Sequence, residues 1–259
     1  MTSALRAEWT KLRTLPGTGW LLLGVVAATV TISATASAAV SCSSPAGCHV
    51  DVTKLSLTGA DLGQAVVAIV AVLAVGGEYA TGMIATTLAA MPRRTTVLAA
   101  KAGVVTAVSL AAGTVAVLGS VLAGRLILPR HGYTPANGYP VLSLANATVL
   151  RAAAGTVLYL ALIALLSLGV ATAVRDSAVA IGSVLGLLYL FPILAAVAGS
   201  AGAQRHLDQI GPMTAGLEIQ ASTGLRHLPI GPWAGLGVLA AWAAAALLAG
   251  VLVLRLRDA

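Results

Sequence analysis

The chain has 259 residues and a mass of 25.7 kDa; hydrophobic residues make up 58% of it, charged residues only 9%, and the formal net charge is +7. So few charged side chains cannot cover a soluble domain of this size, and the same composition excludes a disordered chain, which needs low hydrophobicity and high charge. Unbroken apolar runs of about twenty residues favour membrane-spanning helices over a β-barrel, whose strands alternate apolar and polar residues. The sequence therefore predicts an all-α polytopic membrane protein.

Six apolar runs are predicted to cross the membrane as helices within one domain that covers residues 1–259. About 22 residues of α-helix span roughly 33 Å, which matches the hydrocarbon core of a bilayer. The second run is shorter than the others. The predicted spans are 20–40, 62–77, 102–124, 152–173, 177–198 and 233–254.

The segment before the first span, residues 2–14, has helical amphipathicity. Leu5, Trp9 and Leu12 share one face, and cationic residues lie on both sides of it. This pattern is typical of a helix that lies in the membrane interface. A cationic stretch that only sets the topology is the alternative.

Two cysteines follow the first span. Cys42 and Cys48 are separated by Ser-Ser-Pro-Ala-Gly, which suits a tight loop, and a position outside the cell would allow a disulfide between them. Two unpaired thiols are the alternative. A metal site that includes His49 is disfavoured because no fourth ligand is nearby in the sequence.

The loop between the second and third spans, residues 77–94, reads GEYATGMIATTLAAMPRR. Residues 83–90 are able to form a short helix. Glu78 would suit its N-terminus, and Arg93 and Arg94 would suit its C-terminus. An acidic and a basic flank on one loop indicate a docking surface, although an ordinary cationic loop fits the composition equally well.

Residues 200–231, between the fifth and sixth spans, mix polar residues with mildly apolar intervals. Helical pieces there could return part-way into the membrane if protein covers their backbone, and a plain loop is the alternative. Within the fifth span, Gly182 and Gly186 form a Gly-x-x-x-Gly pair. We expect this pair to pack within the subunit rather than at a dimer seam.

The distribution of Lys and Arg predicts the orientation. Nine of the 15 cationic residues are predicted on the side of the two termini, where the segments are also shorter. By the positive-inside rule, both termini are cytoplasmic. The positive charge then suits anionic lipid, and no basic stretch is interleaved with aromatic residues as a nucleic-acid site would need.

The sequence predicts no catalytic, cofactor or metal site. A phosphate-binding loop is absent because none of Lys11, Lys54 and Lys101 follows a glycine, so this chain cannot hydrolyse ATP by that route. There is no zinc motif and no nucleophile elbow. Carboxylates such as Asp61 and Asp176 are expected only at span ends, which argues against an ion-coupled carrier.

Several segments resemble the permease subunits of bacterial type-2 ABC exporters, which are common in actinobacteria. They are LRAEWTKLRT before the first span, GEYATGMIATTLAAMPRR after the second, VLAAK at the third, and GPWAGLGVLAAWAAAALLAG with the tail LRLRDA at the end. The resemblance implies six helices in the bacterial cytoplasmic membrane, an N-terminal elbow helix, a cytoplasmic coupling helix between helices two and three, and an extracellular element between helices five and six.

The resemblance also implies the partners. A separately encoded ATP-binding subunit would hold ATP and Mg, and a second copy of the chain or a sister permease would complete the path. The residues that would contact the ATPase are Glu78, Tyr79, Gly82, Arg93 and Arg94.

The expected function is therefore export of an apolar or amphipathic cargo, such as a drug, peptide, lipid or natural product, without enzymatic activity of this chain. An accessory or sensor subunit without transport activity is the alternative. A secondary carrier and an intramembrane enzyme are weaker hypotheses, because the spans show no ion site and no nucleophile with its base.

Overall fold

The computed structural model describes residue 10 and residues 16–42, 48, 50–80 and 94–256. Every element in this part of the chain is helical, and six candidate spans are long and apolar enough to cross a membrane. The predicted fold class, an all-helical multi-pass membrane protein, is confirmed. The predicted interfacial helix (Leu5, Trp9 and Leu12) and the predicted coupling helix at 83–90 lie outside the described residues.

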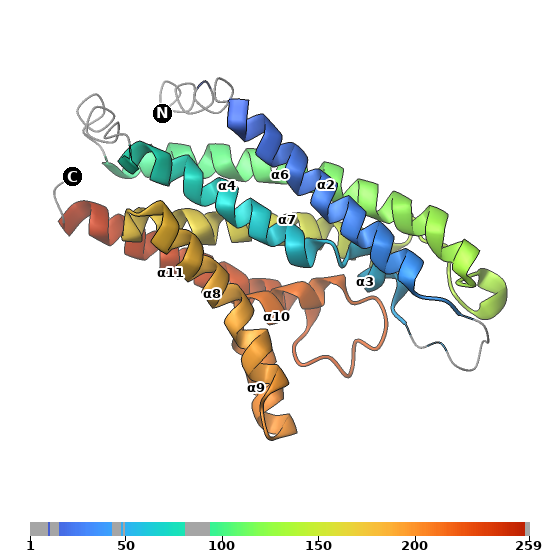
Figure 1. Ribbon diagram of the computed structural model, residues 1–259. Coiled ribbons are helices and arrows are strands. Elements are labelled where there is room, and N and C mark those ends of the chain that lie inside the picture. The colour runs from blue at the N-terminus through green and yellow to red at the C-terminus, as the bar shows by residue number, and fades with distance from the viewer. Residues whose placement is uncertain (1–9, 11–15, 43–47, 49, 81–93, 257–259) are drawn as a thin grey trace.

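The long helices run alongside one another (Figure 1). We call the end where the described chain starts and finishes the terminal end, and the end that carries Cys42 the disulfide end. Each of the six predicted spans overlaps one of the long helices. The long helices are α2 (Pro16–Ala39), α4 (Ala60–Ala80), α6 (Arg94–Ile127), α7 (Ala147–Val174), α8 (Ser177–Ala196) and α11 (Pro232–Leu256).

The second span begins earlier than predicted. A short helix, α3 (Val52–Leu57), precedes α4, and together they form a candidate span from Val52 to Gly77 instead of 62–77. Asp51 caps α3, because its Oδ1 accepts hydrogen bonds from two backbone amides of the first turn at 3.0 and 3.1 Å. The apolar run in the sequence starts only after Asp61, so the pattern alone hides α3.

The third helix is longer than its predicted span. The 34 residues of α6 measure about 51 Å, well beyond the roughly 30 Å of a hydrocarbon core. Its far end continues into the 3-10 helix η1 (Leu128–His131), followed by η2 (Pro135–Asn137). Lys101 and Arg125, predicted at the mouth and the end of the span, both lie inside this helix.

Helix α7 is the centre of the bundle. It packs against α4, α6, α8 and α11, and 61% of its apolar window is buried, compared with 22% in each of α2, α8 and α11. Tyr159, Leu160 and Ile163 of α7 are completely buried. The peripheral helices instead expose large apolar side chains, such as Ile193 and Leu252, as expected for surfaces that face lipid.

Between α8 and α11 the chain forms three short elements. Helix α9 (Ala201–Ile210) projects from the bundle (Figure 1) and has no buried residue. Helix α10 (Pro212–Leu217) and η3 (Glu218–Gln220) are largely buried against α7, α8 and α11. The segment therefore has an exposed part, α9, and a part that the bundle covers, α10 and η3.

The prediction for the glycine pair of the fifth span is wrong. A Cβ atom added at Gly182 or Gly186 would meet nothing within 4 Å, and both residues are exposed. The pair does not bring two helices of this subunit together. The close approach occurs elsewhere, where a Cβ at Gly169 of α7 would lie 2.5 Å from the backbone of α11.

Candidate functional site

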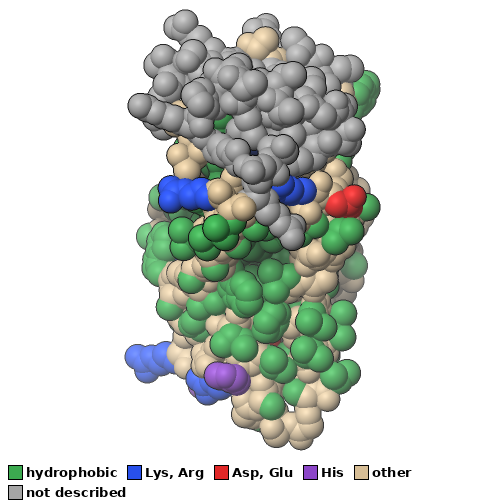
Figure 2. Space-filling view, turned by 90° about the vertical axis from the view of Figure 1, so that its left-hand side faces the viewer, with side chains coloured by type: hydrophobic (Ala, Val, Ile, Leu, Met, Phe, Trp, Pro, Cys, Tyr) green, Lys and Arg blue, Asp and Glu red, His purple; other side chains and the backbone are tan. Residues whose placement is uncertain are grey.

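Three of the five residues predicted to contact an ATPase lie at the terminal end. The backbone of Glu78 and Tyr79 forms the last turn of α4, and Arg94 begins α6; the side chains of these three residues are not described. Gly82 and Arg93 lie outside the described residues. Figure 2 looks onto this end and shows basic side chains with an acidic side chain at the same level of the view.

Two cations near this end bind backbone carbonyls of neighbouring helices. The ammonium group of Lys101, only 4% exposed, donates to the carbonyl oxygen of Ala74 in α4 at 3.2 Å. The guanidinium group of Arg175 donates to the carbonyl oxygen of Val253 in α11, also at 3.2 Å. Arg175 ends α7 in a left-handed conformation, with φ of 65°. Both cations tie helices together, so Lys101 belongs to the interior and not to the mouth of a span.

Deeper in the bundle, four residues form what we call the polar layer: Asp61, Gln64, Tyr159 and Tyr189. The Tyr159 hydroxyl donates to Gln64 Oε1, and Gln64 Nε2 donates to the backbone carbonyl of Asp61 at 3.0 Å. The Tyr189 hydroxyl donates to the same carbonyl at 2.7 Å. The layer thus joins α4, α7 and α8 through groups that are expensive to bury unless they are hydrogen-bonded.

The polar layer lies at membrane depth. Fifteen residues of α7 separate Tyr159 from Val174, or about 22 Å of helix, and Arg175 with Asp176 marks the boundary at the terminal end. A hydrocarbon core is roughly 30 Å thick, so the layer falls within it. The expectation that carboxylates occur only at span ends is wrong for Asp61, because α3 extends the second span beyond it.

At the disulfide end, a second polar group joins α3 to residues 218–223; we call it the latch. Asp51 Oδ1 accepts a hydrogen bond from the Ser222 hydroxyl at 2.6 Å, and Oδ2 accepts from the backbone amides of Ser222 and Thr223, the latter at 2.9 Å. Burial by itself raises the pKa of Asp51, but these bonds and that from the Lys54 amide outweigh it and hold the pKa below 3.8.

Three further contacts complete the latch. The Lys54 ammonium group lies 3.5 Å from Glu218 Oε1, and Gln220 Nε2 donates at 3.5 Å to the carbonyl oxygen of the last residue of α3. Arg151 of α7 donates to a backbone carbonyl in the same segment. Glu218 Oε2 and Arg151 Nε are buried and have no hydrogen-bond partner within the described residues.

The Asp51 bonds lead to a prediction that depends on pH. Because the folded pKa is lowered, the carboxylate contributes its stabilisation above pH 3.8 and loses it as the pH falls through the lower, folded value. Replacing Asp51 with asparagine removes the negative charge and one hydrogen-bond acceptor. At neutral pH each hydrogen bond to a charged group contributes about 1.5–3 kcal/mol. We therefore expect the amide hydrogens of residues 218–223 to exchange about tenfold faster in this variant.

Hydrogen exchange followed by mass spectrometry checks this expectation. Asp176→Asn is the matched control, since Asp176 also caps a helix with its carboxylate, but at the terminal end. Equal exchange of residues 218–223 in Asp51→Asn and the unchanged protein would contradict the assigned role of Asp51.

The two cysteines are joined by a disulfide, with an S–S distance of 2.04 Å. The segment is also fixed to the far end of α6, because the Cys42 amide donates to the carbonyl oxygen of His131 at 2.8 Å and the Tyr139 hydroxyl donates to the Cys48 carbonyl. Gly132 has φ of 90°, and a Cβ there would lie 2.1 Å from the Cys42 carbonyl oxygen.

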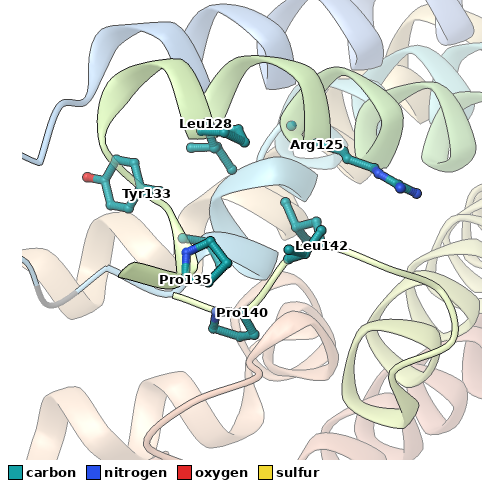
Figure 3. A pocket seen from close by; sticks show the side chains of 10 residues that line it. Arg125, Leu128, Tyr133, Pro135, Pro140 and Leu142 are labelled. Atoms are coloured by element: carbon teal, nitrogen blue, oxygen red, sulfur yellow. The ribbon is translucent and has the colours of Figure 1, made fainter. Parts of the chain in front are cut away.

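A shallow pocket with about 310 Å³ of open space lies beside this segment. Its wall is mostly apolar, and the side chain of Arg125 extends away from Pro135 and Pro140 (Figure 3). Ligand sites usually combine apolar walls with a few convergent polar groups. No such set is present among the residues that line this pocket, so we assign it no ligand.

No three His, Cys, Asp or Glu residues gather into a metal site in the described part of the chain. Sequence reasoning did not find the polar layer or the latch. The only signal for the layer was a carboxylate and a glutamine one helical turn apart, and nothing in the sequence pairs Asp51 with Ser222. No protein-family model matches this chain, and no curated protein is significantly similar to it.

Proposed function

We propose that this chain is the membrane-spanning permease subunit of an ATP-driven type-2 ABC exporter. The observation that carries the proposal is the inner-loop motif GEYATGMIATTLAAMPRR, placed between two helices of a six-span bundle. The chain itself lacks a phosphate-binding loop, so a separately encoded ATPase would bind ATP and Mg and supply the energy. A second copy or a sister permease would complete the path through the membrane.

The proposed orientation places the terminal end in the cytoplasm of a bacterial cell. The basic residues Arg175 and Arg255 at this end support it, together with the cations of the N-terminal segment and of the loop before α6. The disulfide would then lie outside the cell, where such bonds persist. An ATPase in the cytoplasm would meet this end, and the proposed contact residues are Glu78, Tyr79, Gly82, Arg93 and Arg94.

The proposed cargo is apolar or amphipathic. The described helices expose mainly Ala, Gly, Val and Leu along their length, which offers little to a highly hydrated solute. An accessory subunit without transport activity remains the second candidate, because the latch engages most of its polar groups with one another. Cargo movement in vesicles that hold only this chain and its ATPase would exclude that candidate.

The docking claim predicts a loss of complex. Glu78→Gln combined with Arg93→Gln and Arg94→Gln removes three charges from the proposed interface. We expect the triple variant to lose most co-purification with the proposed partner ATPase, and the stimulated ATPase activity to fall at least about tenfold, since each charged contact across an interface is typically worth 1 kcal/mol or more.

The control is Arg125→Gln with Arg130→Gln, which removes two cations at the opposite end of the bundle. This variant should retain the complex. If the triple variant co-purifies with the ATPase as well as the unchanged protein does, these residues are not the docking surface.

A further inference from the structure

We propose that the polar layer binds a lipophilic organic cation through the carboxylate of Asp61. An ionisable residue at membrane depth is costly to retain and is rarely left without a function. No hydrogen bond or ion pair joins the Asp61 carboxylate to another group in the described part of the chain. The Tyr159 hydroxyl donates to the side chain of Gln64, and the Tyr189 hydroxyl donates to the backbone carbonyl of Asp61. Neither of these bonds reaches the Asp61 carboxylate.

The cation that interacts with Asp61 electrostatically forms its ion pair with another residue. Lys54 interacts with Asp61 electrostatically, but its ammonium group lies 3.5 Å from Glu218 and its side chain is 44% exposed. The latch therefore occupies Lys54, and the Asp61 carboxylate has no direct partner among the described residues. Asp61 lies in the first turn of α4, where the helix dipole favours a negative charge.

The surroundings select the chemical class of the ligand. Asp61 is half-buried, and its exposed neighbours on α4 and α8 include Leu62 and Leu190, each 49% exposed. Tyr189 is partly exposed and its hydroxyl donates to the backbone carbonyl of Asp61, so its aromatic ring lies near Asp61 and can interact with a cation through its face. One carboxylate beside a tyrosine ring and exposed leucine side chains suits a bulky organic ammonium or phosphonium ion, whereas a metal ion would require several oxygen ligands.

As a statement about cargo, this inference rests on the proposed export function, but the binding itself requires no ATPase. The two ideas can therefore fail separately. A protein that binds the cation but no ATPase would keep the site and lose the exporter assignment. A protein that couples to an ATPase without binding the cation would keep the exporter assignment and lose the cation site.

The test uses the full-length protein in lipid nanodiscs and the ion tetraphenylphosphonium, with empty nanodiscs as the blank. Tetraphenylborate, which has the same shape and the opposite charge, is the matched ligand control. We expect Asp61→Asn to weaken tetraphenylphosphonium binding at least about tenfold, because 1.4 kcal/mol of lost charge interaction already gives that factor. Tetraphenylborate binding should not weaken.

Two further variants separate charge from structure. Asp61→Glu retains the charge and should retain binding, and Asp176→Asn removes a carboxylate at the terminal end and should leave binding unchanged. Equal binding of tetraphenylphosphonium by Asp61→Asn and the unchanged protein would overturn the proposal. So would an unchanged protein that binds no more of the ion than the empty nanodiscs.

Discussion

Gly169→Ala is expected to lower the thermal stability of the protein more than any other single methyl group added at a described glycine of α7. A Cβ atom at residue 169 would lie 2.5 Å from Ala246 C and from Leu247 N in α11. These are backbone atoms, so no side-chain rotation can relieve the overlap, and α7 would have to move away from α11. Overpacking in a core typically costs 1–3 kcal/mol, and this contact should reach at least about 3 kcal/mol.

The contact also explains why the effect should extend beyond one residue. On α11, Gly250 faces the same crossing, and a Cβ there would lie 3.1 Å from the Gly169 carbonyl oxygen. Membrane helices associate through close packing of small residues, because lipid provides no hydrophobic drive between them. Separation at this point would loosen the most extensive helix pair of the bundle, α7 with α11.

Thermal unfolding in a fixed mild detergent, monitored by size-exclusion chromatography after heating, measures the change. Gly182→Ala is the control, since a Cβ there meets nothing within 4 Å and alanine is the better helix former by up to about 1 kcal/mol. The control should melt at or slightly above the temperature of the unchanged protein. If Gly169→Ala unfolds at the same temperature as Gly182→Ala, then α7 and α11 do not pack closely at residue 169 in solution.

The contrast between these two glycines shows what the sequence could and could not predict. Both occur in apolar helices that the sequence identified, and the Gly-x-x-x-Gly pattern pointed to the residue that turned out to be exposed. Periodicity and hydropathy identify a span, but packing depends on which helix lies in the middle. The apolar windows of α7 and α11 have the same mean hydropathy of 2.4, yet 61% of one and 22% of the other are buried.

The candidate sites were hidden for a related reason. The apolar run starts beside Asp61, so the sequence predicts a span end there, and only the capped helix α3 extends the candidate span beyond it. The latch joins Asp51 to Ser222 across 171 positions of sequence, a separation that no local pattern reports. The disulfide could be predicted from the sequence because Cys42 and Cys48 are only six positions apart.

Gln64→Leu is expected to destabilise the protein by leaving a buried hydroxyl without its partner. Tyr159 and Gln64 are both completely buried, and the Tyr159 hydroxyl donates to Gln64 Oε1. An unsatisfied buried group costs about 1–3 kcal/mol. In membrane proteins, hydrogen bonds between helices average about 0.6 kcal/mol with a maximum near 1.7, so we expect a loss of about 1–2 kcal/mol.

The physical cause can be isolated by removing both partners. If the cost of Gln64→Leu comes from the orphaned hydroxyl, then Tyr159→Phe in the same chain should recover part of it, because the second change removes the group that lacks a partner. The double-mutant cycle should give a coupling energy of at least about 0.5 kcal/mol from the melting temperatures of the four proteins. Strictly additive changes would instead show that the two side chains act independently, and that the polar layer joins α4 to α7 by shape alone.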